Sequence, residues 1–78
     1  MPYFSIPENS ILEAYEYLGM RNGQRMWRSA SKKRYYTWDG LHGEVEVFNK
    51  QGYHLGTMDP LTGEWIKDAI KGRRCDVS

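Results

Sequence analysis

The sequence predicts an α+β fold in which one short N-terminal helix packs on a strongly twisted antiparallel β-sheet, a meander of hairpins. Short segments rich in aromatic and β-branched residues recur with glycine-containing turns between them. One amphipathic stretch near the N-terminus has the apolar spacing of a helix. Because the chain has 78 residues and one cysteine, we expect a single small domain without an intrachain disulfide. We divide this domain (1–78) into an N-terminal helical segment (1–20) and a sheet (21–78).

The helix is predicted over residues 9–19. Ser10 and Glu13 have the spacing of a capping box, and Gly19 stands where a C-cap glycine is expected. The apolar residues between them fall on one stripe of a helix: Ile11, Leu12, Tyr15 and Leu18. We expect this helix to lie on the sheet, with residues 3–6 packed beside it or forming a first short strand.

The strands follow from composition and turn signals. Aromatic, β-branched and alternating residues favour strands, and Asn-Gly, Pro and Gly favour turns. The expected turns are Asn22-Gly23, 49–52 and 59–63. The expected strands are 25–28, 33–38, 43–48, 53–58 and one that starts at 64–66. Residues 67–71 stay open between strand, loop and short helix.

Charge is distributed unevenly along the chain. The net charge is only +1, but residues 1–20 carry −3, and residues 21–34 contain six basic residues and no acid. This basic stripe permits an anionic partner, although a solvated surface explains a charge run equally well. No apolar run is long enough for a membrane-spanning helix, and no signal peptide is recognised.

Titratable residues gather between positions 38 and 47. If His42 lies on the strand, then His42, Glu44 and Glu46 share one face and the intervening valines face the core. Two neighbouring glutamates should repel each other, which would raise the pKa of at least one of them. RNA cleavage by transphosphorylation needs a base, an acid and a cation, but no protein nucleophile. The glutamates, His42 and an arginine could supply these groups; a solvated strand edge is the other interpretation.

Two further patterns leave alternatives open. His42, Asn49 and His54 follow the order of a His-Asn-His metal nuclease, but such a site needs a helix, and His54 falls in a predicted strand. Aromatic and basic residues are interleaved, as in proteins that stack single-stranded RNA bases, although most rings in a small β domain fill the core. Tyr36 and Trp38, which precede the acidic run, are the best candidates for base contact.

Several motifs in one order are similar to a known family. Residues 36–46 read Y-x-W-D-x-x-H-G-E-V-E, residues 54–56 read H-L-G, and residues 59–63 read D-P-L-T-G. With Trp27, these motifs resemble the C-terminal cytotoxic ribonuclease domain of the ribosome-inactivating colicins and cloacin. The likeness covers about two-thirds of the chain, from Trp27 to the end.

The resemblance implies a metal-independent endoribonuclease without a cofactor, which cuts small-subunit rRNA in the decoding region and blocks translation. It implies that Glu46 is the general base, His42 the general acid, Asp39 its orienting partner, Glu44 a supporting carboxylate and Arg73 the cation. The remaining basic and aromatic candidates are expected to bind substrate: Lys33, Arg34, Tyr36, Trp38 and Arg74.

The resemblance also implies partners. These are the ribosome and an acidic immunity protein or antitoxin, with action in the bacterial cytoplasm, either as a stand-alone toxin or after delivery within a larger one. Three features depart from the family pattern: the chain is nearly neutral, residues 72–76 (G-R-R-C-D) replace the family's lysine-rich tail, and the first 20 residues have no recognised counterpart. A non-catalytic RNA- or ribosome-binding module of the same fold is the alternative.

Overall fold

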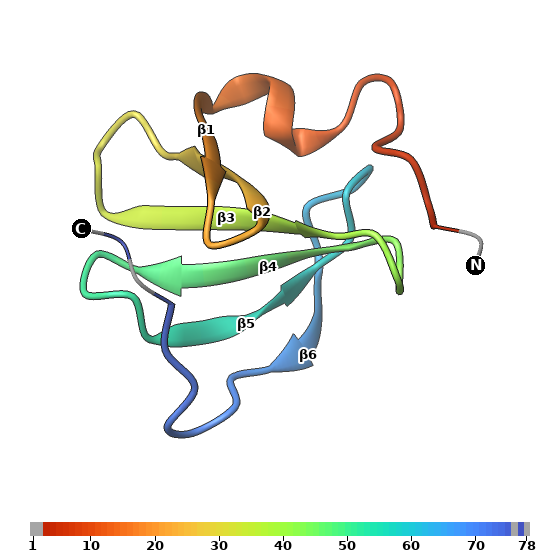
Figure 1. Ribbon diagram of the computed structural model, residues 1–78. Coiled ribbons are helices and arrows are strands. Elements are labelled where there is room, and N and C mark those ends of the chain that lie inside the picture. The colour runs from red at the N-terminus through yellow and green to blue at the C-terminus, as the bar shows by residue number, and fades with distance from the viewer. Residues whose placement is uncertain (1–2, 76, 78) are drawn as a thin grey trace.

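The computed structural model describes residues 3–75 and 77, and these form one six-stranded antiparallel sheet (Figure 1). Each strand pairs with the next one along the chain, so the predicted meander of hairpins is confirmed. In Figure 1 the first two strands stand steeply against the next three, as strong twist requires. The strands are β1 (Glu16–Arg21), β2 (Gln24–Arg28), β3 (Arg34–Asp39), β4 (Glu44–Asn49), β5 (His54–Met58) and β6 (Trp65–Asp68).

The helix predicted over residues 9–19 is wrong, so the fold is mostly β rather than α+β. Only Ile11–Ala14 forms a single 3₁₀ turn, η1, and β1 begins two residues later. Ser10 makes no side-chain capping hydrogen bond, and Gly19, with φ of +89°, lies where the register of β1 shifts against β2. A short isolated helix is marginal in water, whereas pairing with β2 supplies β1 with backbone partners. Residues 16–20 therefore belong to the sheet.

The hydrophobic core lies on one face of the sheet. Strand β4 shows why: Val45 and Val47 are fully buried on this face, and alternation turns Glu44 and Glu46 to the other. Above the valines, the ring of Tyr36 stacks on a tyrosine that precedes β1, with centroids 4.1 Å apart and planes inclined by 8°. The buried members of this core cluster are Leu12, Trp27, Tyr36, Val45, Val47 and Met58.

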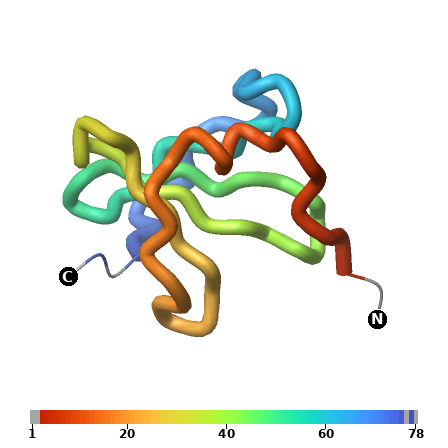
Figure 2. Tube along the Cα trace, turned by 90° about the horizontal axis from the view of Figure 1, so that it is seen from above, coloured from red at the N-terminus to blue at the C-terminus, as the bar shows by residue number. Residues whose placement is uncertain are grey.

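The segment before β1 crosses over strands β3 and β4, as the view in Figure 2 shows. The backbone N–H of Phe4 donates to the carbonyl of Gly40 at 2.7 Å, and Nε1 of Trp38 donates to the carbonyl of Phe4 at 3.0 Å. Residues 3–6 are thus held beside the β3–β4 turn without forming a strand of their own. Among the described residues, no helix has the length and apolar character that crossing a membrane requires.

The C-terminal segment returns to the β4–β5 hairpin. Strand β6 ends at Asp68 and a turn follows, which settles the open assignment of residues 67–71. Arg74 then forms an isolated antiparallel bridge with Tyr53, and the N–H of Cys75 donates to the carbonyl of Gly52 at 2.7 Å. These contacts bring residue 73 back to the central strands.

Candidate active site

Glu46 is the centre of a network on the face opposite the core. It sits in β4 directly across from Thr57 of β5, and the residue is only 8% exposed. One carboxylate oxygen accepts hydrogen bonds from Nε2 of His54 at 2.7 Å and from Oγ1 of Thr57 at 2.8 Å. The other accepts from Nη1 of Arg73 at 3.0 Å. Two donors from β5 and one from the C-terminal segment therefore converge on one carboxylate.

These donors decide the charge of Glu46. Burial alone raises the pKa of its carboxyl, but the hydrogen bonds from His54, Thr57 and Arg73 outweigh burial and hold the pKa below its usual range. The sequence-based expectation that repulsion between Glu44 and Glu46 raises a pKa is therefore wrong for Glu46. At neutral pH the side chain is a carboxylate that can accept a proton.

His54 is fixed in one tautomer. The backbone N–H of Ile70 donates to its Nδ1 at 2.9 Å, so the ring proton sits on Nε2 and is donated to Glu46. The side chain is 1% exposed and lies edge-on to the ring of Phe48, with centroids 5.4 Å apart. The sequence pattern predicted His54 only as a metal ligand, although the H-L-G motif that it begins was a signal for this residue.

His42 lies in the β3–β4 turn and not on β4, which corrects the conditional expectation of a shared strand face. Asp39 organises this turn: its Oδ1 accepts the backbone N–H groups of Leu41 and His42 at 3.1 and 3.2 Å. Its Oδ2 lies 2.8 Å from Nδ1 of His42. The turn is completed by Gly43, whose φ of +68° is in the left-handed region that glycine adopts without strain.

The Asp39–His42 pair is arranged for proton transfer. Burial raises the pKa of Asp39, but the side-chain and backbone hydrogen bonds from His42 outweigh it and lower the pKa. The ionised Asp39 accepts the proton of Nδ1, which leaves Nε2 as the outward nitrogen. Because the His42 side chain is 57% exposed, this nitrogen is accessible to a ligand.

Glu44 lies opposite Asp39 in the β3–β4 ladder and forms an ion pair with Nζ of Lys67 at 2.8 Å. That contact raises the pKa of Lys67. Ligand atoms of Asp39, His42 and Glu44 lie within 4.8 Å of one another, close enough to share a divalent cation. Each of the three already has a protein partner in this structure.

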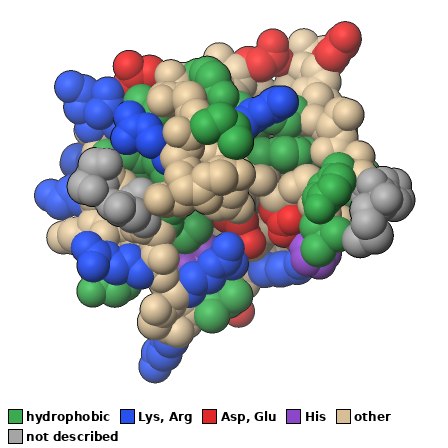
Figure 3. Space-filling view, viewed as in Figure 1, with side chains coloured by type: hydrophobic (Ala, Val, Ile, Leu, Met, Phe, Trp, Pro, Cys, Tyr) green, Lys and Arg blue, Asp and Glu red, His purple; other side chains and the backbone are tan. Residues whose placement is uncertain are grey.

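The candidate acid, base and cation share one cleft. Its volume is about 460 Å³ and its lining includes Asp39, His42, Glu46, His54, Lys67 and Arg73. Figure 3 shows acidic, histidine and basic side chains meeting on this face of the molecule. Arg73 is steadied by the ring of Phe48, which lies 5.8 Å from its guanidinium carbon. The cleft can therefore accept a proton, donate one and hold an anion.

The two residues predicted to contact RNA bases, Tyr36 and Trp38, do not line this cleft. Tyr36 is 2% exposed within the core, and its pKa is raised to about 12, chiefly by burial and then by its hydrogen bond with Tyr15. As placed, Tyr36 has no free face for a base, which corrects its assignment as a substrate contact. Trp38 is half-buried on the same side, where it borders a neighbouring cavity.

The basic residues predicted to bind substrate, Lys33, Arg34 and Arg74, also lie outside the lining of this cleft. Lys33 and Arg34 are exposed where β3 begins, and the Arg34 guanidinium lies 5.6 Å from the ring centroid of Trp65. Arg74 lies 5.5 Å from the ring centroid of Tyr53 and donates to a backbone carbonyl of the β4–β5 turn at 3.1 Å. Arg74 borders a smaller cavity beside the cleft, which Arg73 also lines.

The His-Asn-His arrangement does not form. The Oδ1 atom of Asn49 accepts the N–H groups of Gln51 and Tyr53 at 3.0 and 2.9 Å, so this side chain closes the β4–β5 turn. Both ring nitrogens of His54 are engaged by protein groups. Within the part of the chain that the structure describes, no helix follows His54.

A β domain in which one cleft gathers a carboxylate, a carboxylate-bound histidine and an arginine has the groups of an acid–base enzyme acting on an anion. Comparison with known proteins agrees: residues 12–76 match the model of the family described as Cytotoxic, and the chain belongs to this family. The resemblance seen in the sequence is therefore confirmed.

Three relatives from Escherichia coli show which proteins share the domain. The chain is 43% identical to cloacin over 42 residues, which is 53% of the chain and 8% of cloacin. It is 38% identical to colicin E3 over 45 residues, or 56% of the chain and 8% of that protein. The match to colicin-E6 is 38% over 42 residues, or 53% of the chain and again 8% of the relative. The chain thus corresponds to a small part of each relative and is related to the colicin E3-type cytotoxic ribonuclease domains.

Proposed function

We propose that this domain is an endoribonuclease that cuts small-subunit rRNA in the decoding region and thereby blocks translation. The observation that carries the proposal is the convergence of Glu46, His42 and Arg73 on one cleft in a member of the Cytotoxic family. The reaction is attack of a ribose 2′-hydroxyl on the adjacent phosphate. It needs no metal ion, cofactor or protein nucleophile.

Glu46 accepts the proton of the 2′-hydroxyl, and the new O–P bond forms a phosphorane. Arg73 balances the charge that develops on the phosphorane oxygens. His42 acts in its imidazolium form: Nε2 gives its proton to the departing 5′-oxygen as the O–P bond breaks, which leaves a neutral ring that keeps the Nδ1 proton toward Asp39. The products are a 2′,3′-cyclic phosphate and a free 5′-hydroxyl.

The network around Glu46 can tune its basicity during binding. In the free protein Arg73 donates to Glu46, and this contact helps to lower the pKa of that carboxyl. When a phosphate draws the guanidinium away, Glu46 loses a cationic partner and its pKa rises, so it becomes a stronger base. His54 and Thr57 keep their hydrogen bonds and hold the carboxylate in place.

The remaining assignments complete the proposal. Glu44 supports the site by holding Lys67 beside the cleft. The exposed basic residues Lys33, Arg34 and Arg74 contact phosphates that flank the cut, and Trp38 borders the RNA. The partners are the ribosome and an acidic immunity protein or antitoxin that covers the cleft, and the domain acts in the bacterial cytoplasm, by itself or after delivery in a larger toxin.

The test is translation in a bacterial cell-free extract, followed by primer extension across small-subunit rRNA. We expect translation to stop and one discrete cut to appear, and we expect the same cut when EDTA is present, where only the rRNA is read. His42→Ala and Glu46→Gln should each reduce the cleavage rate by about 10²–10⁴-fold, because each removes one proton-transfer role. Glu64→Gln, a change at an exposed glutamate outside the cleft, serves as the matched control.

Three results would contradict the proposal in different ways. Intact rRNA at a high protein dose would refute cleavage, and RNA that is retarded on a gel without being shortened would indicate a binding module. Loss of cutting in EDTA that Mg²⁺ restores would refute a metal-independent reaction and make the Asp39–His42–Glu44 cluster the first ion site to test.

A further inference from the structure

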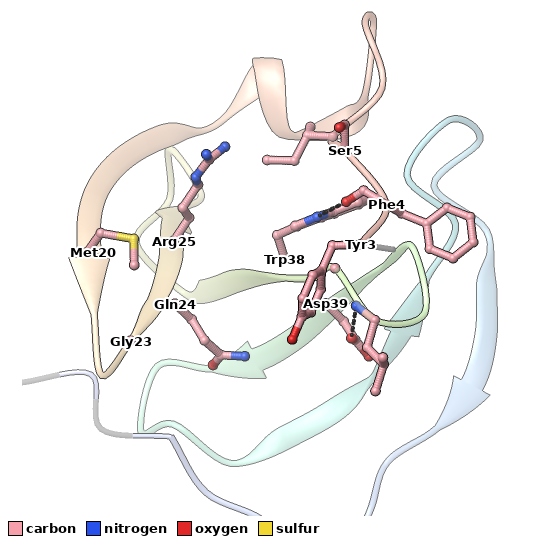
Figure 4. Close-up of a pocket in the computed structure, with 12 residues that line it drawn as sticks. Tyr3, Phe4, Ser5, Met20, Gly23, Gln24, Arg25, Trp38 and Asp39 are labelled. Atoms are coloured by element: carbon pink, nitrogen blue, oxygen red, sulfur yellow. Dashed lines mark hydrogen bonds between the residues drawn. The ribbon is translucent and has the colours of Figure 1, made fainter. Parts of the chain in front are cut away.

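A second cavity, of about 640 Å³, opens directly beside the catalytic cleft (Figure 4). This volume is within the range of small-molecule sites. The cavity and the cleft have three lining residues in common, Gln24, Asp39 and Leu41, so the two spaces adjoin. A ligand bound in the cleft can therefore extend into this cavity.

The walls of the cavity come from distant parts of the chain. Figure 4 shows Tyr3 and Trp38 on one side and Arg25 and Gln24 on the other. The Tyr3 side is fixed by two hydrogen bonds of residue 4: its N–H donates to the carbonyl of Gly40 in the β3–β4 turn, and its carbonyl accepts from Nε1 of Trp38 in β3. Gly40 permits this approach, since a Cβ atom there would lie 3.3 Å from the ring of Tyr3. The cavity is thus a built feature of the fold.

The lining chemistry fits a nucleotide. The ring of Tyr3 is 69% exposed and Met20 is 62% exposed, which offers apolar surface for a base. Arg25 is exposed and forms no ion pair with any residue in 3–75 or 77, so it is available to a phosphate. Gln24 adds an amide for hydrogen bonds to a base edge. The acidic lining residue, Asp39, is already occupied by the turn that carries His42.

We infer that this cavity binds the base of the nucleotide on the 3′ side of the cleaved phosphate, with Tyr3 as the stacking platform and Arg25 as the contact to the next phosphate. The inference rests on the proposed function. The direction follows from position: the two spaces share Asp39, which precedes the turn that carries His42, and Leu41, which lies in that turn beside His42. His42 protonates the 5′-oxygen of the departing nucleotide, and that nucleotide lies on the 3′ side of the cut.

Two further observations agree with this assignment. The Arg73 side of the cleft leads instead to a separate cavity of about 250 Å³, so the two sides of the phosphate meet different surroundings. The family match begins at residue 12, so the Tyr3 wall lies outside the matched region. The subsite would therefore give this chain a sequence preference of its own.

The experiment uses short oligonucleotides with a single ribonucleotide, so that only one phosphate can be cleaved. One form carries a base on the 3′ side of that phosphate, and its twin is abasic there. Cleavage is measured as kcat/KM, and binding of the corresponding all-deoxy oligonucleotides is measured by fluorescence anisotropy. The variants are Tyr3→Ala, Tyr3→Phe and Arg25→Ala. The controls are Tyr17→Ala, at an exposed tyrosine outside the cavity, and Lys50→Ala, which removes a charge elsewhere.

We expect removal of the base to weaken wild-type binding and kcat/KM by about fivefold or more, the usual effect of losing one stacked base. Tyr3→Ala should show the same loss with the base-bearing form and no additional loss with the abasic twin. Tyr3→Phe should keep the wild-type difference, and Arg25→Ala should weaken both forms more than Lys50→Ala does.

The two hypotheses fail separately. If cleavage and binding depended neither on the base nor on Tyr3, the subsite would be refuted, while the proposed ribonuclease activity would stand. Tyr3-dependent binding by a wild-type chain that cuts no RNA would refute the ribonuclease and keep the nucleotide site. A loss with Tyr17→Ala equal to that with Tyr3→Ala would also overturn the subsite, because it would show a general effect of removing a surface ring.

Discussion

The substitution Gly52→Ala tests whether the C-terminal segment holds Arg73 in the active site. Gly52 has φ of +91°, and a Cβ atom there would lie 2.1 Å from the carbonyl oxygen of Cys75. Non-bonded contacts are most favourable at about 3.5–4.0 Å, so the segment must move by more than about 1 Å. The contacts at risk are Cys75 N–H to Gly52, His54 N–H to the carbonyl of Arg73, and Arg73 to Glu46.

Gly19→Ala provides a matched control. Its φ of +89° is almost the same, but a Cβ atom there would meet nothing within 4 Å. Both substitutions should cost about 1–2 kcal/mol for left-handed backbone. Gly52→Ala should lose a further amount of about 0.5–1.5 kcal/mol for each backbone hydrogen bond that breaks. Urea denaturation measures both losses.

Activity separates the two variants more clearly than stability does. If Arg73 balances the phosphorane charge as proposed, its displacement should reduce kcat by about 10²–10³-fold in Gly52→Ala. Gly19→Ala should cut rRNA at nearly the wild-type rate, at a temperature where circular dichroism shows that both variants are folded. If Gly52→Ala were folded and as active as Gly19→Ala, the contact with Cys75 would not be what positions Arg73.

Three further predictions concern the sheet and its carboxylates. Thr57→Val removes one donor to Glu46, so the acid limb of the kcat/KM–pH profile should move to higher pH and unfolding free energy should fall by about 1.5–3 kcal/mol. Because the pKa values of Asp39 and Glu46 are lowered in the folded state, their contribution to stability is full above the unfolded values of about 4 and is lost as pH falls further. Urea titrations between neutral and acid pH should therefore give a shallower loss for Glu46→Gln than for wild type. Gly56→Ala would place a Cβ atom 2.6 Å from the carbonyl oxygen of Lys67, so β6 should exchange its amide hydrogens faster while β2–β4 stay protected.

Much of the sheet could be predicted because its signals are local. Asn22-Gly23 and residues 59–63 have turn chemistry that acts within four residues, and both form the expected turns between strands. Residues 16–19 misled the prediction, because the apolar spacing suits a helix while a neighbouring strand decides the outcome. The lone capping pattern at Ser10 could not outweigh the backbone hydrogen bonds that β2 offers β1.

In the candidate site, too, some contacts are set by neighbouring residues of the sequence and others by the pairing of distant segments. A bulge-free hairpin closed by residues 49–52 would pair Phe48 with Tyr53 and hence Glu46 with Leu55. In the structure Phe48 pairs with His54 instead of Tyr53, and the register shifts by one more residue between Val47 and Phe48. Together these two offsets place Thr57 opposite Glu46. No local pattern predicts these offsets, so His54 and Thr57 were missed as donors to Glu46, whereas Arg73 was expected from the family resemblance. The Asp39–His42 pair lies only three residues apart, and its proximity follows from the turn itself.

The difference between locally held and distantly held residues predicts which part of the candidate site loses its structure first on warming. Asp39 and His42 are carried by one turn between paired central strands, and Glu46 is in the middle of the sheet. Arg73 depends on a segment after β6 whose residues are mostly exposed and which is attached by a few backbone hydrogen bonds. Segments of that kind open locally at a lower free energy than the core. An opening there removes the cation and frees Glu46 while the acid pair stays intact, so activity should fall on warming before the sheet unfolds.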